Sequence, residues 1–128
     1  MTDNPMKIRR VYFQFKVDDL IRAKDFYNKI FDFDIAFFQG VEIGWAEIQL
    51  PSEVRLGLNL RLPKEEKKDS LGVLTFEVEN LEESREYFAK KGLEPTEIYD
   101  NPNNISYFNL KDTEENRIQI VGDPRIKD

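Results

Sequence analysis

The sequence contains neither cysteine nor histidine. Without cysteine the chain can form no disulfide, no thiolate nucleophile and no cysteine-ligated metal site. Without histidine it cannot form a metal site of two histidines and one carboxylate. These absences exclude most of the familiar ways in which a small protein binds a transition metal or carries out nucleophilic catalysis.

Long apolar runs and an excess of basic charge are also missing. No segment approaches the roughly 20 apolar residues that span a bilayer, and the first ten residues, MTDNPMKIRR, lack the apolar stretch of an export signal. The sequence therefore predicts a cytoplasmic protein with no membrane partner. With 25 acidic and 19 basic side chains the net charge is −6, which disfavours a nucleic-acid partner. The basic cluster Lys7, Arg9 and Arg10 is too short to reverse that, and we expect it to be solvated.

What the chain does contain is enough apolar material for one compact domain. It has 128 residues, of which 40% are apolar, and these include ten Phe, five Tyr and one Trp. A chain of this length is large enough to bury an ordinary core. We therefore expect a single domain over residues 1–128 with a core rich in aromatic side chains.

The most informative feature of the sequence is an internal repeat. Residues 13–27, FQFKVDDLIRAKDFY, resemble residues 74–88, LTFEVENLEESREYF, which begin 61 positions later (74 minus 13). The matched pairs are Phe15 and Phe76, Val17 and Val78, and Leu20 and Leu81. A repeat of this period indicates two copies of one supersecondary unit, neither of which can bury its apolar face alone.

The first copy has the pattern of a strand, a helix and three more strands. Residues 9–17 alternate between apolar and polar side chains, which predicts a half-buried strand. Asp18 and Asp19 are suited to cap a helix, and apolar residues at helical spacing carry that helix to about Phe31. The further strands are expected at 34–39, 43–50 and 54–62.

The second copy follows the same plan after a charged connector at 63–70. A strand at 72–78 precedes a helix that begins at Asn80, with Glu83 as its capping-box partner, and stops at Gly92. Its remaining strands are expected at 94–99, 104–110 and 116–121. The sequence thus predicts an α+β fold of two βαβββ modules, at 9–62 and 71–122.

Three segments resemble the vicinal oxygen chelate superfamily, which includes glyoxalase I, the extradiol dioxygenases and the bleomycin- and fosfomycin-resistance proteins. They are VDDLIRAKDFY at 17–27, VENLEESREYF at 78–88 and LKDTEENRIQI at 110–120. The last resembles the F-x-D-P-x-G-N-x-I-E-L ending of that family, with Thr113 in place of Pro and Glu115 in place of Gly. The resemblance covers residues 9–122. It implies that the two modules together form a cup-shaped mixed sheet that encloses a ligand.

The resemblance also places four metal-ligand positions, usually His and Glu, on Tyr12, Gly57, Val73 and Gln119. Glycine and valine have no side-chain donor, and a phenol or a neutral amide is a weak substitute for imidazole or carboxylate. We therefore expect no metal and no other cofactor. The substitutions argue against lactoylglutathione lyase, extradiol cleavage and fosfomycin opening. Whether the chain is an enzyme stays open; if it is, the resemblance implies a lyase, isomerase or dioxygenase.

Strand alternation divides the residues of each module between a helix-facing set and a set that faces the cup. The cup-facing residues that we expect to bind a ligand are Tyr12, Gln14, Trp45, Glu47, Arg55, Asn59, Thr75, Glu77, Tyr107, Asn109, Arg117 and Gln119. Such a mixture of polar and aromatic side chains suits a site that stacks a planar or sugar-like molecule and fixes it with a few hydrogen bonds. Trp45 and Tyr107 would stack, and Gln14, Asn59, Thr75 and Gln119 would supply hydrogen bonds. The alternative is a solvated sheet face with no ligand.

Individual residues of this face have two interpretations. Glu47 and Glu77 would be an acid–base pair if they approach each other, and otherwise each forms a salt bridge with Lys16, Arg55 or Arg117. Trp45 is either a stacking platform or core filler. Outside the face, the acidic residues Asp112, Glu114 and Glu115 lack the spacing of a calcium loop, which favours an acidic turn.

These observations predict a metal-free protein that captures a small organic molecule stoichiometrically, as the drug-sequestering members of the superfamily do. One alternative is a metal-dependent glyoxalase- or dioxygenase-type enzyme with an atypical site. Another is a non-catalytic interaction subunit whose cup is a vestige. The resemblance further implies a homodimer.

Overall fold

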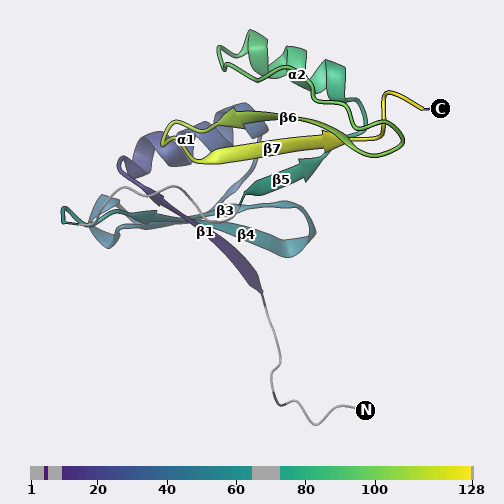
Figure 1. The fold of residues 1–128 in the computed structure, drawn as a ribbon. Helices are drawn as coiled ribbons and strands as arrows, with labels where there is room; N and C mark the ends of the chain where they lie inside the picture. The colour runs from purple at the N-terminus through teal and green to yellow at the C-terminus, as the bar shows by residue number, and fades with distance from the viewer. Residues whose placement is uncertain (1–4, 6–9, 65–72, 128) are drawn as a thin grey trace. The chain divides into compact units, whose positions relative to one another are not determined.

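A computed structural model describes residue 5 and residues 10–64 and 73–127 (Figure 1). Most of the expected connector, residues 65–70, lies outside the described residues, as do Lys7 and Arg9 of the basic cluster and the start of the strand expected at 72–78. The chain divides into two units, Met1–Arg61 and Leu62–Asp128. Each unit has its own small sheet.

The first unit forms a four-stranded mixed sheet with one α-helix. Its elements are β1 (Val11–Val17), α1 (Leu20–Phe31), β2 (Ile35–Phe38), the 3-10 turn η1 (Val41–Ile43), β3 (Trp45–Gln49), the 3-10 turn η2 (Pro51–Glu53) and β4 (Val54–Leu60). The strand order is β1-β4-β3-β2, with β1 parallel to β4 and the other neighbours antiparallel. This is the βαβββ order that the sequence predicts.

Helix α1 begins and ends where the sequence predicts. The carboxylate of Asp19 accepts a hydrogen bond from the backbone N–H of Arg22 at 3.0 Å, which satisfies one of the free donors of the first turn. The helix ends at Phe31 because Asp32 adopts a left-handed conformation at φ 58°. Its buried residues are Leu20, Ala23, Phe26 and Tyr27.

The two faces of the first sheet differ as the alternation predicts. Phe15, Ile48, Leu56 and Leu58 are buried with α1, which packs on β3 and β4. The residues that alternate with them along the strands belong to the other face, and they are Gln14, Lys16, Glu47, Gln49, Arg55, Gly57 and Asn59. The register is therefore the expected one, because a shift of one residue would have exposed the apolar set.

The second unit forms a three-stranded mixed sheet with one α-helix. Its elements are β5 (Leu74–Glu77), α2 (Leu81–Lys90), β6 (Ser106–Lys111) and β7 (Arg117–Gly122), in the order β5-β7-β6. Strand β5 is parallel to β7, and β6 is antiparallel to it. The side chain of Asn80 accepts a hydrogen bond from the N–H of Glu83 at 2.9 Å, and Gly92 follows the helix at φ +87°, so both predicted ends of α2 are confirmed.

The strand expected at 94–99 is wrong: Tyr99 forms an isolated bridge to Tyr107 of β6, and the Thr96 N–H adds a single hydrogen bond to the carbonyl of Asn109. Pro95 has no N–H to donate to a ladder. The guanidinium of Arg85 on α2 donates hydrogen bonds to the carbonyls of Thr96, at 2.7 Å, and of Pro95, at 3.3 Å. The carbonyls of Pro95 and Thr96 are therefore bonded to Arg85 instead of β6, and the second module is βαββ with a bridge.

The second core lies between α2 and its sheet. Phe108, Leu110, Ile118 and Ile120 on β6 and β7 are buried, together with Leu81 and Phe88 on the helix. The fold class is thus confirmed as α+β, with two small sheets of mixed strands. None of the described helices is long and apolar enough to cross a membrane.

Candidate functional site

The polar face of the first sheet is organised around Trp45. Its indole lies directly over Gly57 of the neighbouring strand, where a Cβ would overlap Cη2 of the ring and come within 2.7 Å of Cζ2. The indole Nε1–H donates a hydrogen bond to Oε2 of Glu47 at 2.8 Å. The ring of Tyr12 on β1 lies 6.4 Å from that of Trp45, centroid to centroid, with the planes tilted by 53°. Trp45 is thus outside the helix-facing core.

The second oxygen of Glu47 is held by Arg55. Nη1 of Arg55 lies 2.6 Å from Oε1 of Glu47, and Nε donates to Oε1 of Gln49 at 3.1 Å. The side chains of Arg55 and Glu47 are only 20% and 12% exposed. These contacts confirm the salt-bridge interpretation of Glu47 and identify Arg55 as its partner. We call Tyr12, Trp45, Glu47 and Arg55 the Trp45 cluster.

The pKa of Glu47 is lowered by this environment. Burial acts to raise it, but the hydrogen bonds from Trp45 and Arg55, the positive charge of Arg55 and a hydrogen bond with Tyr12 together outweigh burial. The carboxylate is therefore ionised at neutral pH with both oxygens bonded. A group in that state is a poor general base.

Two further predicted residues adjoin the cluster through the sheet register. Gln14 of β1 lies opposite Gly57 of β4, and Asn59 of β4 lies opposite Trp45 of β3. Six of the twelve predicted residues thus occupy neighbouring positions on three adjacent strands. They are Tyr12, Gln14, Trp45, Glu47, Arg55 and Asn59.

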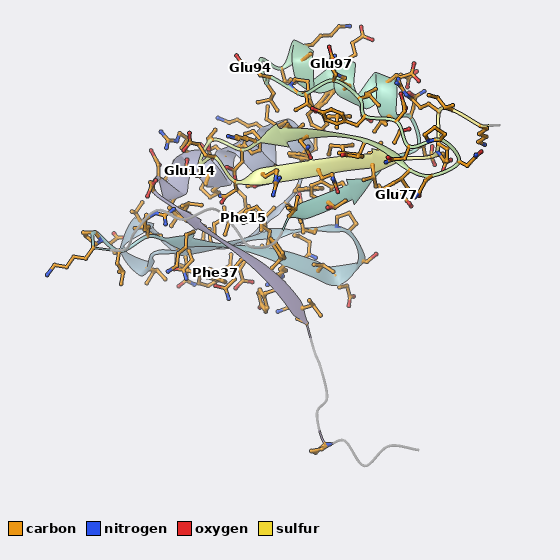
Figure 2. The ribbon with its side chains drawn as sticks, in the orientation of Figure 1. Phe15, Phe37, Glu77, Glu94, Glu97 and Glu114 are labelled. Atoms are coloured by element: carbon orange, nitrogen blue, oxygen red, sulfur yellow. The ribbon has the colours of Figure 1, made fainter. Side chains whose placement is uncertain are left out.

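The other six predicted residues belong to the polar face of the second sheet. Thr75, Gln119 and Asn109 form one row across β5, β7 and β6, with the Thr75 hydroxyl 3.4 Å from Oε1 of Gln119. On one side of this row, two residues from Asn109 along β6, the ring of Tyr107 packs against Tyr99 at 5.3 Å between centroids. Arg117 lies on the other side of the row, opposite Lys111, and Glu77 lies at the end of β5, where it is exposed (Figure 2).

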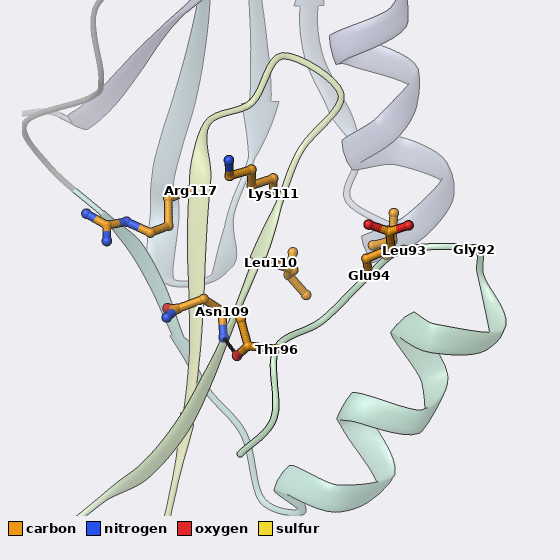
Figure 3. Close-up of a pocket in the computed structure, with 8 residues that line it drawn as sticks. All are labelled: Gly92, Leu93, Glu94, Thr96, Asn109, Leu110, Lys111 and Arg117. Atoms are coloured by element: carbon orange, nitrogen blue, oxygen red, sulfur yellow. Dashed lines mark hydrogen bonds between the residues drawn. The ribbon is translucent and has the colours of Figure 1, made fainter. Parts of the chain in front are cut away.

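A hollow in the second unit involves residues that the sequence did not single out. It has a volume of about 550 Å³ and lies where the segment after α2 separates from β6 (Figure 3). Its lining residues are Gly92, Leu93, Glu94, Thr96, Asn109, Leu110, Lys111 and Arg117. Only Asn109 and Arg117 were predicted. The one signal in the sequence was Pro95, which disfavours a regular edge strand there.

The acidic residues after β6 form a turn, as the sequence favours. Oδ1 of Asp112 accepts hydrogen bonds from the backbone N–H groups of Glu114 and Asn116, both at 2.8 Å. Asp112 and Glu114 are buried, and Glu115 adopts the left-handed conformation at φ 66°. Within residues 10–64 and 73–127, no three or more acidic side chains are grouped as a metal site would require.

The four positions that correspond to the superfamily's metal ligands do not fit a transition metal. In the first unit Gly57 offers no donor, and the indole of Trp45 covers the space that a longer side chain would need. In the second unit Val73 offers no donor, and the amide oxygen of Gln119 lies beside the Thr75 hydroxyl. Tyr12 and Gln119 supply only weak donors in place of imidazole and carboxylate.

Comparisons with known proteins agree with this fold. No curated protein matches the chain. Among solved structures, TnmS3, an antibiotic-binding protein from Streptomyces sp. CB03234, is 22% identical with a TM-score of 0.75, covering 92% of this chain and 98% of that one. A lactoylglutathione lyase from Agrobacterium tumefaciens is 15% identical with a TM-score of 0.72, covering 93% and 95%.

A third similar structure comes from Sphaerobacter thermophilus and has a TM-score of 0.76 at 15% identity, covering 91% of this chain and 98% of that one. At such identities these structures show the fold alone. The family is shown by the sequence itself, because the profile of one superfamily matches residues 9–120. The chain therefore belongs to the glyoxalase/bleomycin resistance protein/dioxygenase superfamily.

Proposed function

We propose that this protein binds a small organic molecule, without a metal, on the Trp45 cluster. The observation that carries the proposal is the way in which Trp45 is held. Its indole rests on Gly57 and is hydrogen-bonded to Glu47, although it lies on the polar face of the sheet. A platform that is already ordered loses little conformational entropy when a ligand stacks on it.

The surrounding groups favour a ligand with a planar body and hydrogen-bonding substituents. Tyr12 is 40% exposed and lies close enough to Trp45 to offer a second aromatic surface. The charges of Glu47 and Arg55 neutralise each other, so the cluster needs no charged ligand. The amides of Gln14 and Asn59 lie one register position away and would bond to polar substituents.

Capture rather than turnover is the mechanism that these residues support. Both oxygens of Glu47 accept hydrogen bonds that lower its pKa and weaken it as a base, and the family's metal positions lack donors at Gly57 and Val73. TnmS3, which has the same fold, is described as an antibiotic-binding protein. The lactoylglutathione lyase shares the fold equally well, so a metal-dependent enzyme is the competing proposal that the experiment must address.

The proposal includes a cytoplasmic homodimer with no nucleic-acid partner. The net charge of −6 supports the absence of a nucleic-acid partner. The pairing of related proteins supports the homodimer. Light scattering on the purified protein would give twice the mass of the chain. A monomer at all concentrations would contradict the dimer and leave the ligand proposal standing.

The ligand proposal is tested by a thermal-shift screen of an antibiotic and metabolite library, followed by titration of each hit. Trp45 is the only tryptophan, so its fluorescence reports directly on the site. We expect saturable binding that quenches this fluorescence, is lost in Trp45→Ala and persists in Tyr87→Ala, which removes an exposed ring on α2. Binding that survives Trp45→Ala would contradict the proposed site.

Elemental analysis after dialysis separates capture from metal-dependent catalysis. We expect ligand binding to be unchanged by a strong chelator and the dialysed protein to hold less than stoichiometric metal. The metal-free proposal would be overturned if the dialysed protein held stoichiometric nickel, zinc, manganese or iron and if a chelator that removed this metal also abolished ligand binding.

A further inference from the structure

The hollow of the second unit lies where the hydrogen bonds between β6 and the segment after α2 stop at Thr96. The segment after α2 is tied to β6 by the Thr96 N–H, which donates to the carbonyl of Asn109 at 2.9 Å, and by the Asn109 N–H, which donates to the Thr96 hydroxyl at 3.0 Å. Before Thr96 comes Pro95, which has no N–H to continue the pairing. Gly92, Leu93 and Glu94 therefore separate from the end of β6 and leave the hollow between them (Figure 3).

One part of the lining is apolar. Leu110 is only 3% exposed and contributes to the core of the unit, and Leu93 on the opposing segment is half-buried. The Thr96 hydroxyl already accepts from Asn109 and donates to the carbonyl of Glu97 at 2.9 Å. Its O–H is therefore no longer free to donate, and the two leucines make this side of the hollow favour an apolar group.

Another part of the lining is cationic. Lys111 and Arg117 are directly opposite each other across β6 and β7, and both are exposed. Like charges in opposed positions of an antiparallel pair destabilise it. Among the described residues no carboxylate forms an ion pair with either of them. Glu94 is exposed and comes from the facing segment, so the three charges of the lining sum to a net positive charge (Figure 3).

We propose that this hollow binds an organic carboxylate with an apolar body. The carboxylate would lie against Lys111 and Arg117, where charge-assisted hydrogen bonds are strong and a guanidinium can bind both oxygens. The apolar body would lie against Leu93 and Leu110. A volume of about 550 Å³ is within the range of small-molecule sites. This site is in a different unit from the Trp45 cluster and does not depend on the function proposed there.

The test uses the whole chain labelled with ¹⁵N and three probes: sodium octanoate, octylammonium chloride and sodium phosphate. We expect octanoate to shift the backbone resonances of Leu93, Thr96 and Leu110 saturably, and octylammonium and phosphate to leave them in place. In the double variant Lys111→Gln/Arg117→Gln the dissociation constant for octanoate should rise about tenfold or more, because two charge-assisted contacts are lost.

A matched control removes the same amount of charge elsewhere. Lys29→Gln/Lys90→Gln deletes two exposed lysines that form i,i+4 ion pairs on α1 and α2, and it should bind octanoate as the parent does. Trp45→Phe should also leave octanoate binding unchanged, which separates this site from the Trp45 cluster. The proposal is overturned if octanoate shifts no resonance of the hollow, if the two double variants weaken binding equally, or if octylammonium or phosphate binds as tightly as octanoate.

Discussion

Trp45 and Gly57 are complementary in shape: the six-membered ring of the indole occupies the space that a side chain at residue 57 would fill. A Cβ there would overlap Cη2 and lie 2.7 Å from Cζ2 and 3.0 Å from Cζ3. Gly57 is in a regular strand between Leu56 and Leu58, so the requirement for glycine is set by the ring above it. The same contact fixes the platform on which the proposed ligand stacks.

Gly57→Ala should therefore displace the indole and break its hydrogen bond to Glu47. We expect a loss of about 1–3 kcal/mol in the free energy of unfolding, as for other small-to-large changes in packed sites. The emission of the single tryptophan should also shift to longer wavelength as the ring moves toward water. Urea denaturation and a fluorescence spectrum of the folded protein measure the two effects.

The double variant Gly57→Ala/Trp45→Ala provides the control, because alanine at 57 then meets no ring. In the Trp45→Ala background the alanine at 57 should cost little, so the two substitutions should show a clear coupling free energy. Additive effects of the two substitutions would mean that the glycine is required for some other reason.

Glu47→Gln should make stability less dependent on pH. The pKa of Glu47 is lowered from its ordinary value of 4.5, so the ion pair contributes stability above that pH and loses it as the pH falls through the lower folded-state value. At pH 7 we expect the variant to be less stable by about 1 kcal/mol, the scale of a partly screened ion pair. That difference should shrink in acid.

Urea denaturation of both proteins at several values between pH 7 and pH 3 measures this difference. Glu77→Gln is the matched control, because it removes one carboxylate that is exposed at the end of β5. A deficit of Glu47→Gln that grows toward acid would contradict the lowered pKa.

The periodicity of the sequence was sufficient to predict the two faces of each sheet. Along β1, Phe15 and Val17 are buried and Gln14 and Lys16 are exposed, because side chains of a strand alternate and only one register buries the apolar set. The helix ends were predicted equally well, since Asp19 and Asn80 satisfy local backbone donors that any helix leaves free. Both the faces of the sheets and the ends of the helices depend on residues close together in the sequence, so both could be predicted from it.

The strand expected at 94–99 and the hollow beside it depend on contacts across the chain. The carbonyl of Thr96 accepts a hydrogen bond from Arg85, which is 11 residues away on α2. The periodicity of a sequence does not predict such a bond. Similarly, the strand expected from residue 43 begins at Trp45, because Val41–Ile43 form a 3-10 turn that Gly44 closes at φ +73°. The alternation was sufficient to predict that Trp45 lies on the polar face. Its contact with Gly57 could not be predicted, because that contact depends on the register between β3 and β4.

Asp100 should titrate far below an ordinary carboxyl. Arg125 donates two hydrogen bonds to it, at 2.8 Å and 2.7 Å, and Ser106 a third at 2.7 Å, and together they lower its pKa from 3.8 to about 2. Its contribution to stability is therefore complete above pH 3.8 and is lost as the pH falls toward 2. A ¹³C NMR titration of the side-chain carboxyl should give a midpoint of about 2.

In Arg125→Gln this midpoint should rise toward 3.8, stopping short of it because the bond from Ser106 remains. Arg22→Gln, which removes an arginine from α1 in the other unit, should leave it unchanged. A midpoint near 4 in the parent protein would show that Arg125 does not bind Asp100 in solution.

Asp112→Ala should destabilise the turn between β6 and β7. The carboxylate accepts from two backbone N–H groups and, at 3.1 Å, from the side chain of Asn116, and the residue is 6% exposed. Loss of these acceptors leaves donors unpaired, so we expect a decrease of about 3 kcal/mol in unfolding free energy. Asp123→Ala, which removes an exposed carboxylate, is the control. In a separate measurement, calcium should not raise the melting temperature of the parent protein. A rise of several degrees with calcium would favour a metal loop.

Glu115→Gly should stabilise the protein. Glu115 occupies the same turn at φ 66°, a left-handed conformation that costs a residue with a Cβ about 1 kcal/mol and costs glycine almost nothing. The superfamily ending that this segment resembles has glycine at the position. We expect a gain of up to about 1 kcal/mol in unfolding free energy, reduced by the greater entropy of glycine in the unfolded chain. Glu115→Ala separates the two effects of the change, since it removes the carboxylate and keeps the Cβ, and it should give no gain. Equal stabilisation by alanine and glycine would show that the charge of Glu115, rather than its backbone conformation, is what the turn disfavours.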